Sequence, residues 1–309
     1  MKKSRKRILV IKLGALGDFI LATGPFYAIR AAHPNDEIVL LTTEPFAEIG
    51  RASNLFDDVW IDDRPSSINI IAIQRLRRQL RGARFTRVYD LQTSSRSAWY
   101  FQLMRSFFRP EWSGVAFGAS HPHCNNNRNN MHTIERQADQ LAMAGIPETP
   151  FPDLSWLTSD VSRFSLPDNY VLLIPGGAAH RPEKRWPAAS YREIAASISE
   201  KGILPIVIGG QDEIQLAADI AADNNARSIA GETSFADIAE LSRHAVSAIG
   251  NDTGPAHIAA ICGCPSVVLF SNASNPDISA PRGKDVTILR CENLRDLSVS
   301  KVAEASRLL

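Results

Sequence analysis

Apolar residues recur along the chain in short blocks that are separated by longer stretches of helical periodicity. Residues 8–11 are four consecutive aliphatic residues, and residues 37–42 (EIVLLT) form a second block. Continuous apolar blocks of this length are typical of strands buried on both faces of a parallel sheet. We predict such strands over residues 8–11, over residues 37–42 and in a segment that ends at Asp90.

Between these blocks, apolar residues recur at the three- and four-residue spacing of amphipathic helices. We predict helices over residues 19–32, 68–80, 95–107 and 133–144. Because strands and helices alternate, the first half of the chain is expected to form a parallel sheet with helices on both faces.

The alternation is interrupted over residues 145–167, which contain four prolines and little periodicity. Such a segment is typical of a linker between domains. Beyond it the alternation resumes. We predict strands at residues 170–174, 204–208, 245–249 and 266–270, and helices at residues 188–199, 214–222, 235–243 and 255–262.

This layout predicts an α/β chain of two doubly wound, Rossmann-like domains with a cleft between them. We place the domains at residues 1–155 and 156–309 and leave open whether the last helix packs back on the N-terminal domain. Ligands of such sheets bind beyond the carboxyl ends of the strands. The loops that follow strands are therefore the candidates for chemistry.

Composition limits the classes of function. The net charge is only +1, so no global field attracts nucleic acid, and no nucleic-acid partner is expected. No apolar run approaches the roughly 20 residues of a membrane-spanning helix, and no signal-peptide core follows the basic start. We expect a cytoplasmic protein, and we leave open a peripheral contact with the cytoplasmic face of the inner membrane.

The first candidate loop follows residues 8–11 and contains Gly14, Gly17 and Asp18. Glycines let backbone N–H groups approach a ligand, and the N-terminus of the next helix favours an anion. A dinucleotide fingerprint fits poorly, because the glycine spacing is irregular and no acidic residue closes the second strand. Asp18 is either the N-cap of the helix or an exposed base.

A second glycine-rich loop follows residues 170–174 and becomes basic toward its end. It carries Gly176 and Gly177, then His180, Arg181 and Lys184. A lysine charge beside a flexible backbone suits a phosphate. For each single cation, a solvated surface position is an equal alternative.

Two further loops carry acids beside glycines. Glu213 opens a helix, where its carboxylate either complements the helix dipole or accepts hydrogen bonds from ribose hydroxyls. Asp252 precedes Thr253 and Gly254 at another helix N-terminus, an arrangement that binds anions through backbone N–H groups and one hydroxyl. We interpret His257, one turn into this helix, as a ligand contact rather than a structural group.

In this order the motifs resemble glycosyltransferase family nine, the ADP-heptose:lipopolysaccharide heptosyltransferases. The resemblance covers nearly the whole chain. It rests on Leu-Gly-Asp18, Pro-Gly-Gly with Lys184-Arg-Trp186-Pro, Gly-Gly-x-x-Glu213, and Asn-Asp-Thr-Gly-Pro-Ala-His257 with Gly-x-Pro265 after it. The block that ends at His257 is the most specific of these motifs.

The resemblance implies a GT-B fold, in which the N-terminal half binds the acceptor and the C-terminal half binds an ADP-sugar. It also implies an inverting transfer of a heptose from ADP-heptose to a lipid-linked core oligosaccharide, the inner core of lipopolysaccharide. Neither a metal nor another cofactor is expected, and no residue is assigned to a metal.

By the same resemblance, Asp18 matches the general base and Lys184 matches the lysine that neutralises the donor phosphates. Glu213 matches the acid that holds the ribose, with Asp212 as the neighbouring alternative. The block that grips the diphosphate and sugar is matched by Asp252, Thr253, Gly254 and His257. The remaining residues of the expected donor site are Gly14, Gly17, Gly176, Gly177, His180 and Arg181.

The chain departs from the family's pattern at two places. Residues 14–15 are Gly-Ala and residues 178–180 are Ala-Ala-His where well-known members carry hydroxyl residues, so side-chain donors to phosphate are missing. Another nucleotide sugar as donor, or a non-catalytic nucleotide-sugar-binding protein, therefore remains an alternative. A dinucleotide-dependent oxidoreductase is the alternative from a different class.

Two polar segments have no assigned role. Residues 120–131 are rich in asparagine and predict a surface loop; a metal site at His121, His123, Cys124 and His132 is an alternative that fits no common spacing. A group of arginines concentrates positive charge on the first half of the chain. Three alternatives are open for this group: it binds phosphates or carboxylates of the acceptor, it contacts an anionic membrane surface, or it forms a solvated helix face. The arginines are Arg75, Arg77, Arg78, Arg81, Arg84 and Arg87.

Overall fold

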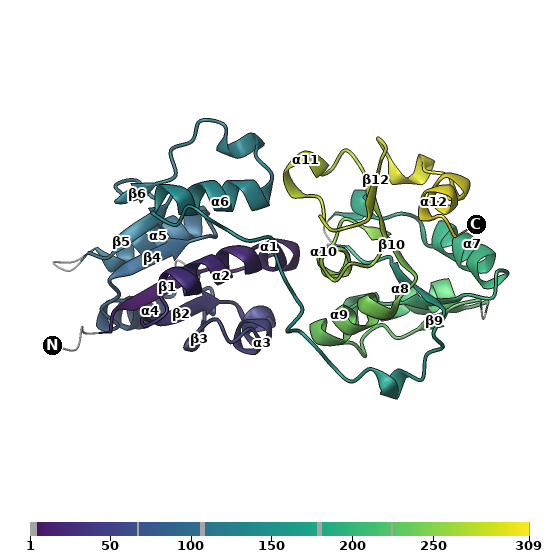
Figure 1. Cartoon of the computed structure of the whole chain (residues 1–309), viewed down its shortest axis with the longest axis horizontal. Coiled ribbons are helices and arrows are strands. Elements are labelled where there is room, and N and C mark those ends of the chain that lie inside the picture. Colours follow the sequence, from purple (N-terminus) through teal and green to yellow (C-terminus); the bar gives the residue numbers. More distant parts are fainter. Residues whose placement is uncertain (1–4, 67, 106–108, 178–180, 224, 309) are drawn as a thin grey trace. The chain divides into compact units, whose positions relative to one another are not determined.

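The computed structural model describes residues 5–66, 68–105, 109–177, 181–223 and 225–308. They belong to two compact α/β units, Met1–Pro152 and Asp153–Leu309 (Figure 1). The sequence placed this boundary after residue 155. None of the helices in the described ranges has the length and apolarity needed to cross a bilayer.

The N-terminal unit is built on a parallel sheet of six strands in the order β3-β2-β1-β4-β5-β6. The central strand β1 pairs with β2 and β4, so that Val10 lies between Leu40 and Tyr89. The strands are β1 Arg7–Ile11, β2 Glu37–Thr42, β3 Asp58–Ile61, β4 Arg87–Asp90, β5 Glu111–Gly114 and β6 His121–Pro122.

Both faces of the N-terminal sheet are buried. Leu9 and Ile11 of β1 pack with Leu80 and Tyr100 on one face, and the alternate residues of β1 are buried on the other. The helices are α1 Leu16–Leu21, α2 Thr23–Ala32, α3 Glu44–Ala52, α4 Ile70–Gly82, α5 Ser95–Met104 and α6 Thr133–Met143.

The C-terminal unit repeats this arrangement. Its parallel sheet has the order β12-β11-β10-β7-β8-β9, in which β7 is the first strand in sequence. The strands are β7 Tyr170–Ile174, β8 Leu204–Val207, β9 Arg227–Ser228, β10 Ser247–Asn251, β11 Ser266–Phe270 and β12 Val286–Arg290.

One face of the C-terminal sheet packs against α7, α8 and α12, where Val171 and Leu173 meet Tyr191, Ile220 and Val302. The buried apolar residues of α12 therefore belong to the core of the C-terminal unit. The helices are α7 Ala188–Ser199, α8 Ile214–Ala221, α9 Phe235–His244, α10 Gly254–Ile261, α11 Pro276–Ser279 and α12 Val299–Ser306.

The first predicted helix differs from the observed structure. In place of one helix over residues 19–32, α1 and α2 are separated at Ala22. Pro25 explains the break, because it has no N–H to donate to the carbonyl four residues earlier and its ring collides with that carbonyl in a continuous helix. The sequence also missed the strands β3, β5, β6, β9 and β12. Of these, β3 and β12 are half-exposed edge strands that lack a fully apolar run.

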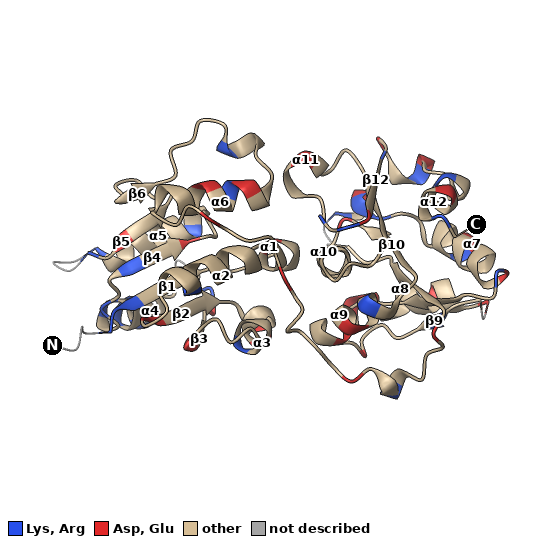
Figure 2. Cartoon of the chain, viewed as in Figure 1, with Lys and Arg blue, Asp and Glu red and all other residues tan. Residues whose placement is uncertain are grey.

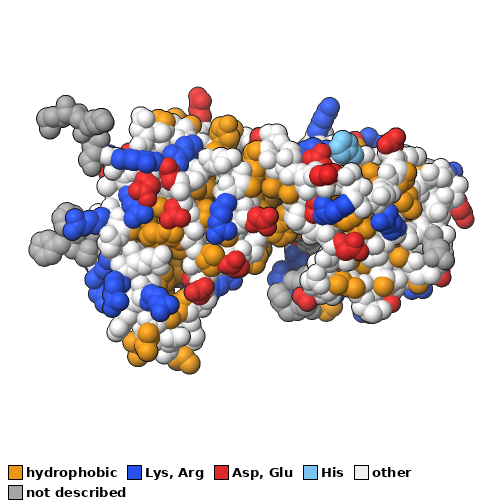
Figure 3. All heavy atoms as spheres, turned by 90° about the horizontal axis from the view of Figure 1, so that it is seen from below, with side chains coloured by type: hydrophobic (Ala, Val, Ile, Leu, Met, Phe, Trp, Pro, Cys, Tyr) orange, Lys and Arg blue, Asp and Glu red, His pale blue; other side chains and the backbone are white. Residues whose placement is uncertain are grey.

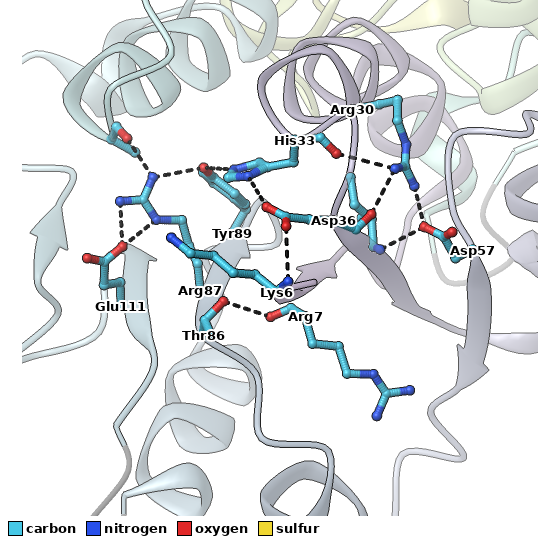
Figure 4. Close-up of polar contacts among 12 residues, drawn as sticks. Lys6, Arg7, Arg30, His33, Asp36, Asp57, Thr86, Arg87, Tyr89 and Glu111 are labelled. Atoms are coloured by element: carbon cyan, nitrogen blue, oxygen red, sulfur yellow. Dashed lines mark hydrogen bonds and ion pairs between the residues drawn. The ribbon is translucent and has the colours of Figure 1, made fainter. Parts of the chain in front are cut away.

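A polar network closes the amino-terminal edge of the first sheet (Figure 4). His33, which follows α2, contacts the Tyr89 hydroxyl through Nε2 (2.8 Å) and the Asp36 carboxylate through Nδ1 (3.2 Å). Arg87 donates to the same hydroxyl (3.1 Å) and pairs with Glu111 at 2.5 Å. The network holds α2, β4 and β5 together, at the edge opposite the loops that follow the strands.

His33 makes the stability of the N-terminal unit depend on pH. Burial lowers the pKa of His33, against the attraction of Asp36. Because its pKa is lower in the folded state than in the unfolded chain, protons bind preferentially to the unfolded chain as the pH falls below about 6.5. The contribution of neutral His33 is therefore complete at neutral pH and is lost on acidification.

We predict that His33→Gln costs about 1 kcal/mol at pH 7, through the weakened hydrogen bond to Tyr89. We also expect the variant to lose less thermal stability than the wild type between pH 7 and pH 5. Calorimetric melting temperatures at the two pH values measure both effects, with the exposed His244→Gln as a control. Equal acid sensitivity of His33→Gln and the wild type would contradict this role.

Candidate active site

The order of strands in each sheet reverses beside the first strand of that sheet. In the C-terminal unit the chain runs from β7 outward through β8 and β9, then returns to β10 on the other side of β7. Ligands of doubly wound sheets bind at this reversal, beyond the carboxyl ends of the strands. The loops after β7, β8 and β10 are those in which the sequence placed most of the donor site.

Asn251, the last residue of β10, joins two of these loops, and its side chain is fully buried. Its Nδ2 donates to the carbonyl oxygens of Pro175 (2.8 Å) and Gly176 (3.1 Å). Its Oδ1 accepts from the backbone N–H of Trp186 and from the Tyr191 hydroxyl, both at 3.1 Å. The amide thus uses its full hydrogen-bonding capacity to fix the loop after β7 against β10.

Lys184 and Asp252 form an ion pair beside this junction. Lys184 ends a short 3-10 helix, Pro182–Lys184, and its Nζ lies 2.7 Å from Oδ2 of Asp252. Only 14% of the lysine side chain and 9% of the aspartate side chain are exposed, so water screens the pair weakly. The pair brings together two predicted site residues and holds the lysine next to the N-terminus of α10.

Thr253 is the N-cap residue of α10, and Gly254 is the first residue of this helix. The Thr253 hydroxyl does not cap the helix; it is buried and has no hydrogen-bond partner among the described residues. Pro255 has no N–H, and the N–H of Ala256 donates to the Thr253 carbonyl. The Thr253 hydroxyl and the backbone N–H of Gly254 are therefore the groups at this helix start that are suited to bind an anion. His257 lies on the same helix and is buried, with 5% of the residue exposed.

Glu213 directs its carboxylate toward the loop after β7. Its Oε2 accepts a hydrogen bond from the backbone N–H of Gly210 (2.8 Å), as expected for an acid at a helix start. Its Oε1 lies so close to Gly176 that a Cβ there would come within 3.1 Å of it. Asp212 is exposed, whereas Glu213 is partly buried. The geometry therefore favours Glu213 over Asp212 as the acid of this site.

The basic residues of the loop after β7 have different contacts. The guanidinium of Arg185 donates to the carbonyl of Gly177, so this arginine fixes the loop itself. Arg181 is exposed. His180 lies outside the described residues. Lys184 forms an ion pair with another predicted site residue, Asp252.

In the N-terminal unit the corresponding loop follows β1. Gly14 has φ +113°, and a Cβ on it would collide with the ring of Phe46, so the position requires glycine. The helix α1 has Ala15 as its N-cap, which places Gly17 and Asp18 in the first turn. The alternative that Asp18 caps this helix is therefore wrong, because the chain becomes helical before reaching it. Its carboxylate is half-buried at the carboxyl-terminal edge of the sheet.

Two buried titratable residues at the carboxyl-terminal ends of β1 and β4 were not assigned to the site from the sequence. Lys12 directly follows β1, and Asp90 ends β4; both are almost fully buried. Burial lowers the pKa of Lys12, against the attraction of Asp18 and Asp90. Burial raises the pKa of Asp90 to about 6, although its Oδ1 accepts two backbone hydrogen bonds from the next loop. A charged residue at the end of an apolar strand was the available signal.

The asparagine-rich segment is partly buried, which corrects the expectation of a plain surface loop. His123 is 5% exposed, and its Nε2 lies 2.8 Å from Oδ2 of Asp139 on α6. Asn125 donates to the same oxygen at 2.9 Å. In the part of the chain that the structure describes, no three His, Cys, Asp or Glu side chains form a group that could hold a metal. The segment is thus attached to α6 through one carboxylate.

Two arginines bring positive charge to the same edge. Arg128 lies in a short 3-10 helix, Arg128–Asn130, and Arg136 lies in α6. Burial and the repulsion from Arg136 lower the pKa of Arg128, against the attraction of Asp90. Arg136 also repels the charge of Lys12. Arg136 therefore repels both Arg128 and Lys12, and Asp90 attracts these two cations. An anionic group would stabilise this arrangement.

Comparison with known proteins gives one family for most of the chain. The profile of glycosyltransferase family 9 (heptosyltransferase) matches residues 73–306. Lipopolysaccharide heptosyltransferase 2 of Salmonella typhimurium is 24% identical over 317 aligned residues, which cover 92% of this chain and 88% of the relative.

Solved structures agree in fold. The Escherichia coli ADP-heptose lps heptosyltransferase II superimposes with a TM-score of 0.79 at 22% identity and covers 97% of both chains. The Escherichia coli heptosyltransferase WaaC with ADP-2-deoxy-2-fluoro heptose gives a TM-score of 0.74 at 19% identity, with 96% of this chain and 98% of that chain covered. The predicted architecture of two Rossmann-like domains of the GT-B type is thereby confirmed.

We predict that Asn251→Asp destabilises the C-terminal unit by about 3 kcal/mol, because a carboxylate then faces two carbonyl oxygens and leaves them without a donor. Chemical denaturation at neutral pH measures the change. Asn275→Asp is the matched control, because Asn275 caps α11 only through its oxygen and aspartate caps equally well. A similar loss of stability in both variants would show that Asn251 is not the tie between these loops.

Proposed function

The chain belongs to glycosyltransferase family 9 (heptosyltransferase), and on this premise we propose that it transfers a heptose from ADP-heptose to a lipopolysaccharide inner-core acceptor. Membership makes the chain a glycosyltransferase and sets aside the dinucleotide-dependent oxidoreductase that the first glycine loop left open. The observation that carries the proposed donor site is a group of three features: the Lys184–Asp252 ion pair, the N-terminus of α10, and the Thr253 hydroxyl, which has no hydrogen-bond partner among the described residues.

In the proposed complex the C-terminal unit holds the donor. The ribose of ADP is placed at Glu213, whose Oε1 lies beside Gly176. The diphosphate is placed at Lys184, the Thr253 hydroxyl and the backbone N–H of Gly254 at the start of α10. These groups are cations and hydrogen-bond donors, so they suit a diphosphate without requiring a metal. The WaaC structure with an ADP-heptose analogue makes this donor class the natural first test.

In the proposed reaction the N-terminal unit activates the acceptor. The Asp18 carboxylate takes the proton of an acceptor hydroxyl, and the hydroxyl oxygen attacks the anomeric carbon of the heptose. The bond from that carbon to the diphosphate breaks on the opposite face, so ADP leaves and the configuration is inverted. Lys12 and Asp18 attract each other.

Charge develops on the leaving diphosphate as this bond breaks. Lys184 and the α10 N-terminus stabilise that charge, and each such donor is worth about 2–4 kcal/mol of the barrier. Asp252 keeps the lysine at the position where this charge appears. The acceptor is anionic in this proposal, and the cations near Asp90 are the groups that would meet its phosphates or carboxylates.

Calorimetric titration tests the donor, with ADP-heptose, ADP, GDP and UDP added to the purified chain with and without EDTA. We expect the two adenine nucleotides to bind equally well with and without EDTA. Binding of UDP or GDP instead would assign another nucleotide sugar and overturn the heptose donor. Loss of binding in EDTA would overturn the metal-independent reaction.

We predict that Asp18→Asn binds ADP-heptose as tightly as the wild type, while kcat for transfer falls about 10²–10⁴-fold, because the amide cannot accept the hydroxyl proton. Isothermal titration and a transfer assay on core acceptor measure the two quantities separately. If neither the wild type nor the variant transfers sugar but both bind it, the chain is a nucleotide-sugar-binding protein.

We predict that Lys184→Met lowers both ADP affinity and kcat, the latter about 10²–10³-fold, because the leaving diphosphate loses its positive charge. Lys201→Met, at an exposed position, is the control and is expected to leave both values unchanged. A variant that loses affinity but keeps the wild-type kcat would show that Lys184 binds the ground state and the transition state equally well and does not assist the chemical step.

A further inference from the structure

The segment that leads into α4 exposes three large aliphatic side chains. Ile68 is 86% exposed, Ile70 is 65% exposed and Ile71 is 79% exposed. A single exposed isoleucine is ordinary on a protein surface. Here three exposed isoleucines occur within four residues at the start of a helix, and they form a small exposed apolar patch. Packing in the protein core does not account for this patch.

The faces of α4 separate core packing from this projection. Leu76 and Leu80 are the buried residues of the helix and pack in the N-terminal core. Ile71, Arg75 and Arg78 are exposed, and they occur at the i, i+4, i+7 spacing that aligns side chains on one helix face. One apolar and two basic side chains therefore share the outward face of α4.

The charge of α4 has a single sign. The helix contains four arginines and no acidic residue (Figure 2). Arg81 donates to the backbone carbonyls of Leu103 and Arg105, so its charge is held against the protein. The other three arginines are exposed and form no ion pair with the described residues. Figure 3 shows a face of the N-terminal unit on which hydrophobic side chains protrude beside Lys and Arg side chains.

We propose that Ile68, Ile70, Ile71, Arg75 and Arg78, hereafter the α4 surface, dock this protein on an anionic lipid bilayer. Aliphatic side chains beside unpaired cations fit an interface in which acyl chains lie directly beneath negatively charged headgroups. A protein partner would have to supply acids for the arginines and an apolar pocket for the isoleucines. The inference rests on the proposed function only in that a lipid-anchored acceptor gives the docking a use.

Co-sedimentation with vesicles tests the proposal without donor or acceptor. We compare vesicles of phosphatidylcholine alone with vesicles of phosphatidylcholine and phosphatidylglycerol. The wild type is expected to bind the anionic vesicles and to bind less as salt rises, because salt screens the arginines. The triple variant Ile68→Ser, Ile70→Ser, Ile71→Ser is expected to bind at least about tenfold more weakly, because it loses the apolar part of the contact.

A matched control removes apolar side chains that are exposed elsewhere in the same unit. Tyr27 and Phe151 are each 52% exposed, and the double variant Tyr27→Ser, Phe151→Ser is expected to bind vesicles like the wild type. Unchanged melting temperatures would show that both variants fold. Equal loss of binding in the control and the triple variant would overturn the specific role of the α4 surface.

Two further outcomes would overturn the proposal. One is a wild type that binds neither kind of vesicle. The other is a triple variant that keeps vesicle binding but changes from dimer to monomer in analytical centrifugation, which would make the α4 surface an interface between copies. Transfer to a deacylated, soluble acceptor separates this inference from the proposed function. The triple variant is expected to keep that transfer at the wild-type rate while it loses vesicle binding.

Discussion

The reversal of strand order beside the first strand of each sheet is the constraint on which the rest of this protein depends. At that point neighbouring helices connect on opposite sides of the sheet, so the loops above the strands diverge and their backbone groups are accessible. In the C-terminal unit the reversal lies between β7 and β10, and the glycines, the lysine and the acid of the donor site all follow these strands or β8. In the N-terminal unit it lies between β1 and β4, where Asp18 and Asp90 are found.

Loops at such a reversal contain glycines and little apolar surface, so apolar packing does not hold them in place. Here hydrogen bonds from buried polar side chains hold them. Asn251 holds two backbone segments with four hydrogen bonds, and Lys12 donates from a buried position to the loop after β4. A buried polar group that is fully bonded specifies one arrangement of its partners, since every alternative arrangement leaves it unsatisfied. These buried polar side chains therefore fix the geometry of the loops.

Charge is organised differently at the two kinds of surface on this protein. In the candidate donor site a lysine is already paired with an acid, so its position is set before a diphosphate arrives, at the cost of part of its attraction for the ligand. On α4, Arg75, Arg77 and Arg78 form no ion pair with the described residues and lie near exposed isoleucines. Paired, half-buried charge suits a site that must orient one small ligand. Unpaired, exposed charge suits an extended surface whose headgroups move.

The sequence by itself determined the elements whose signal is local. The strands over residues 170–174 and 266–270 and the helix over residues 188–199 were predicted with the bounds observed, because an unbroken apolar run or a helical period is contained within the element. It also located the loops of the candidate site, since these follow directly from the strands. Half-exposed edge strands such as β3 and β12 were missed, because they lack an apolar run and form only by pairing with a neighbouring strand.

Only the tertiary structure decided which side chains in those loops act together. In the structure, Asp18 lies inside the first turn of α1 and does not cap this helix. Glu213 is the acid that lies close to Gly176. Lys184 contacts Asp252, which is 68 positions away in the sequence. The tertiary structure also buries His123 against Asp139 and exposes the isoleucines that precede and open α4. These outcomes depend on distances between residues far apart in the chain, and such distances are fixed by how helices pack on a sheet rather than by any local pattern.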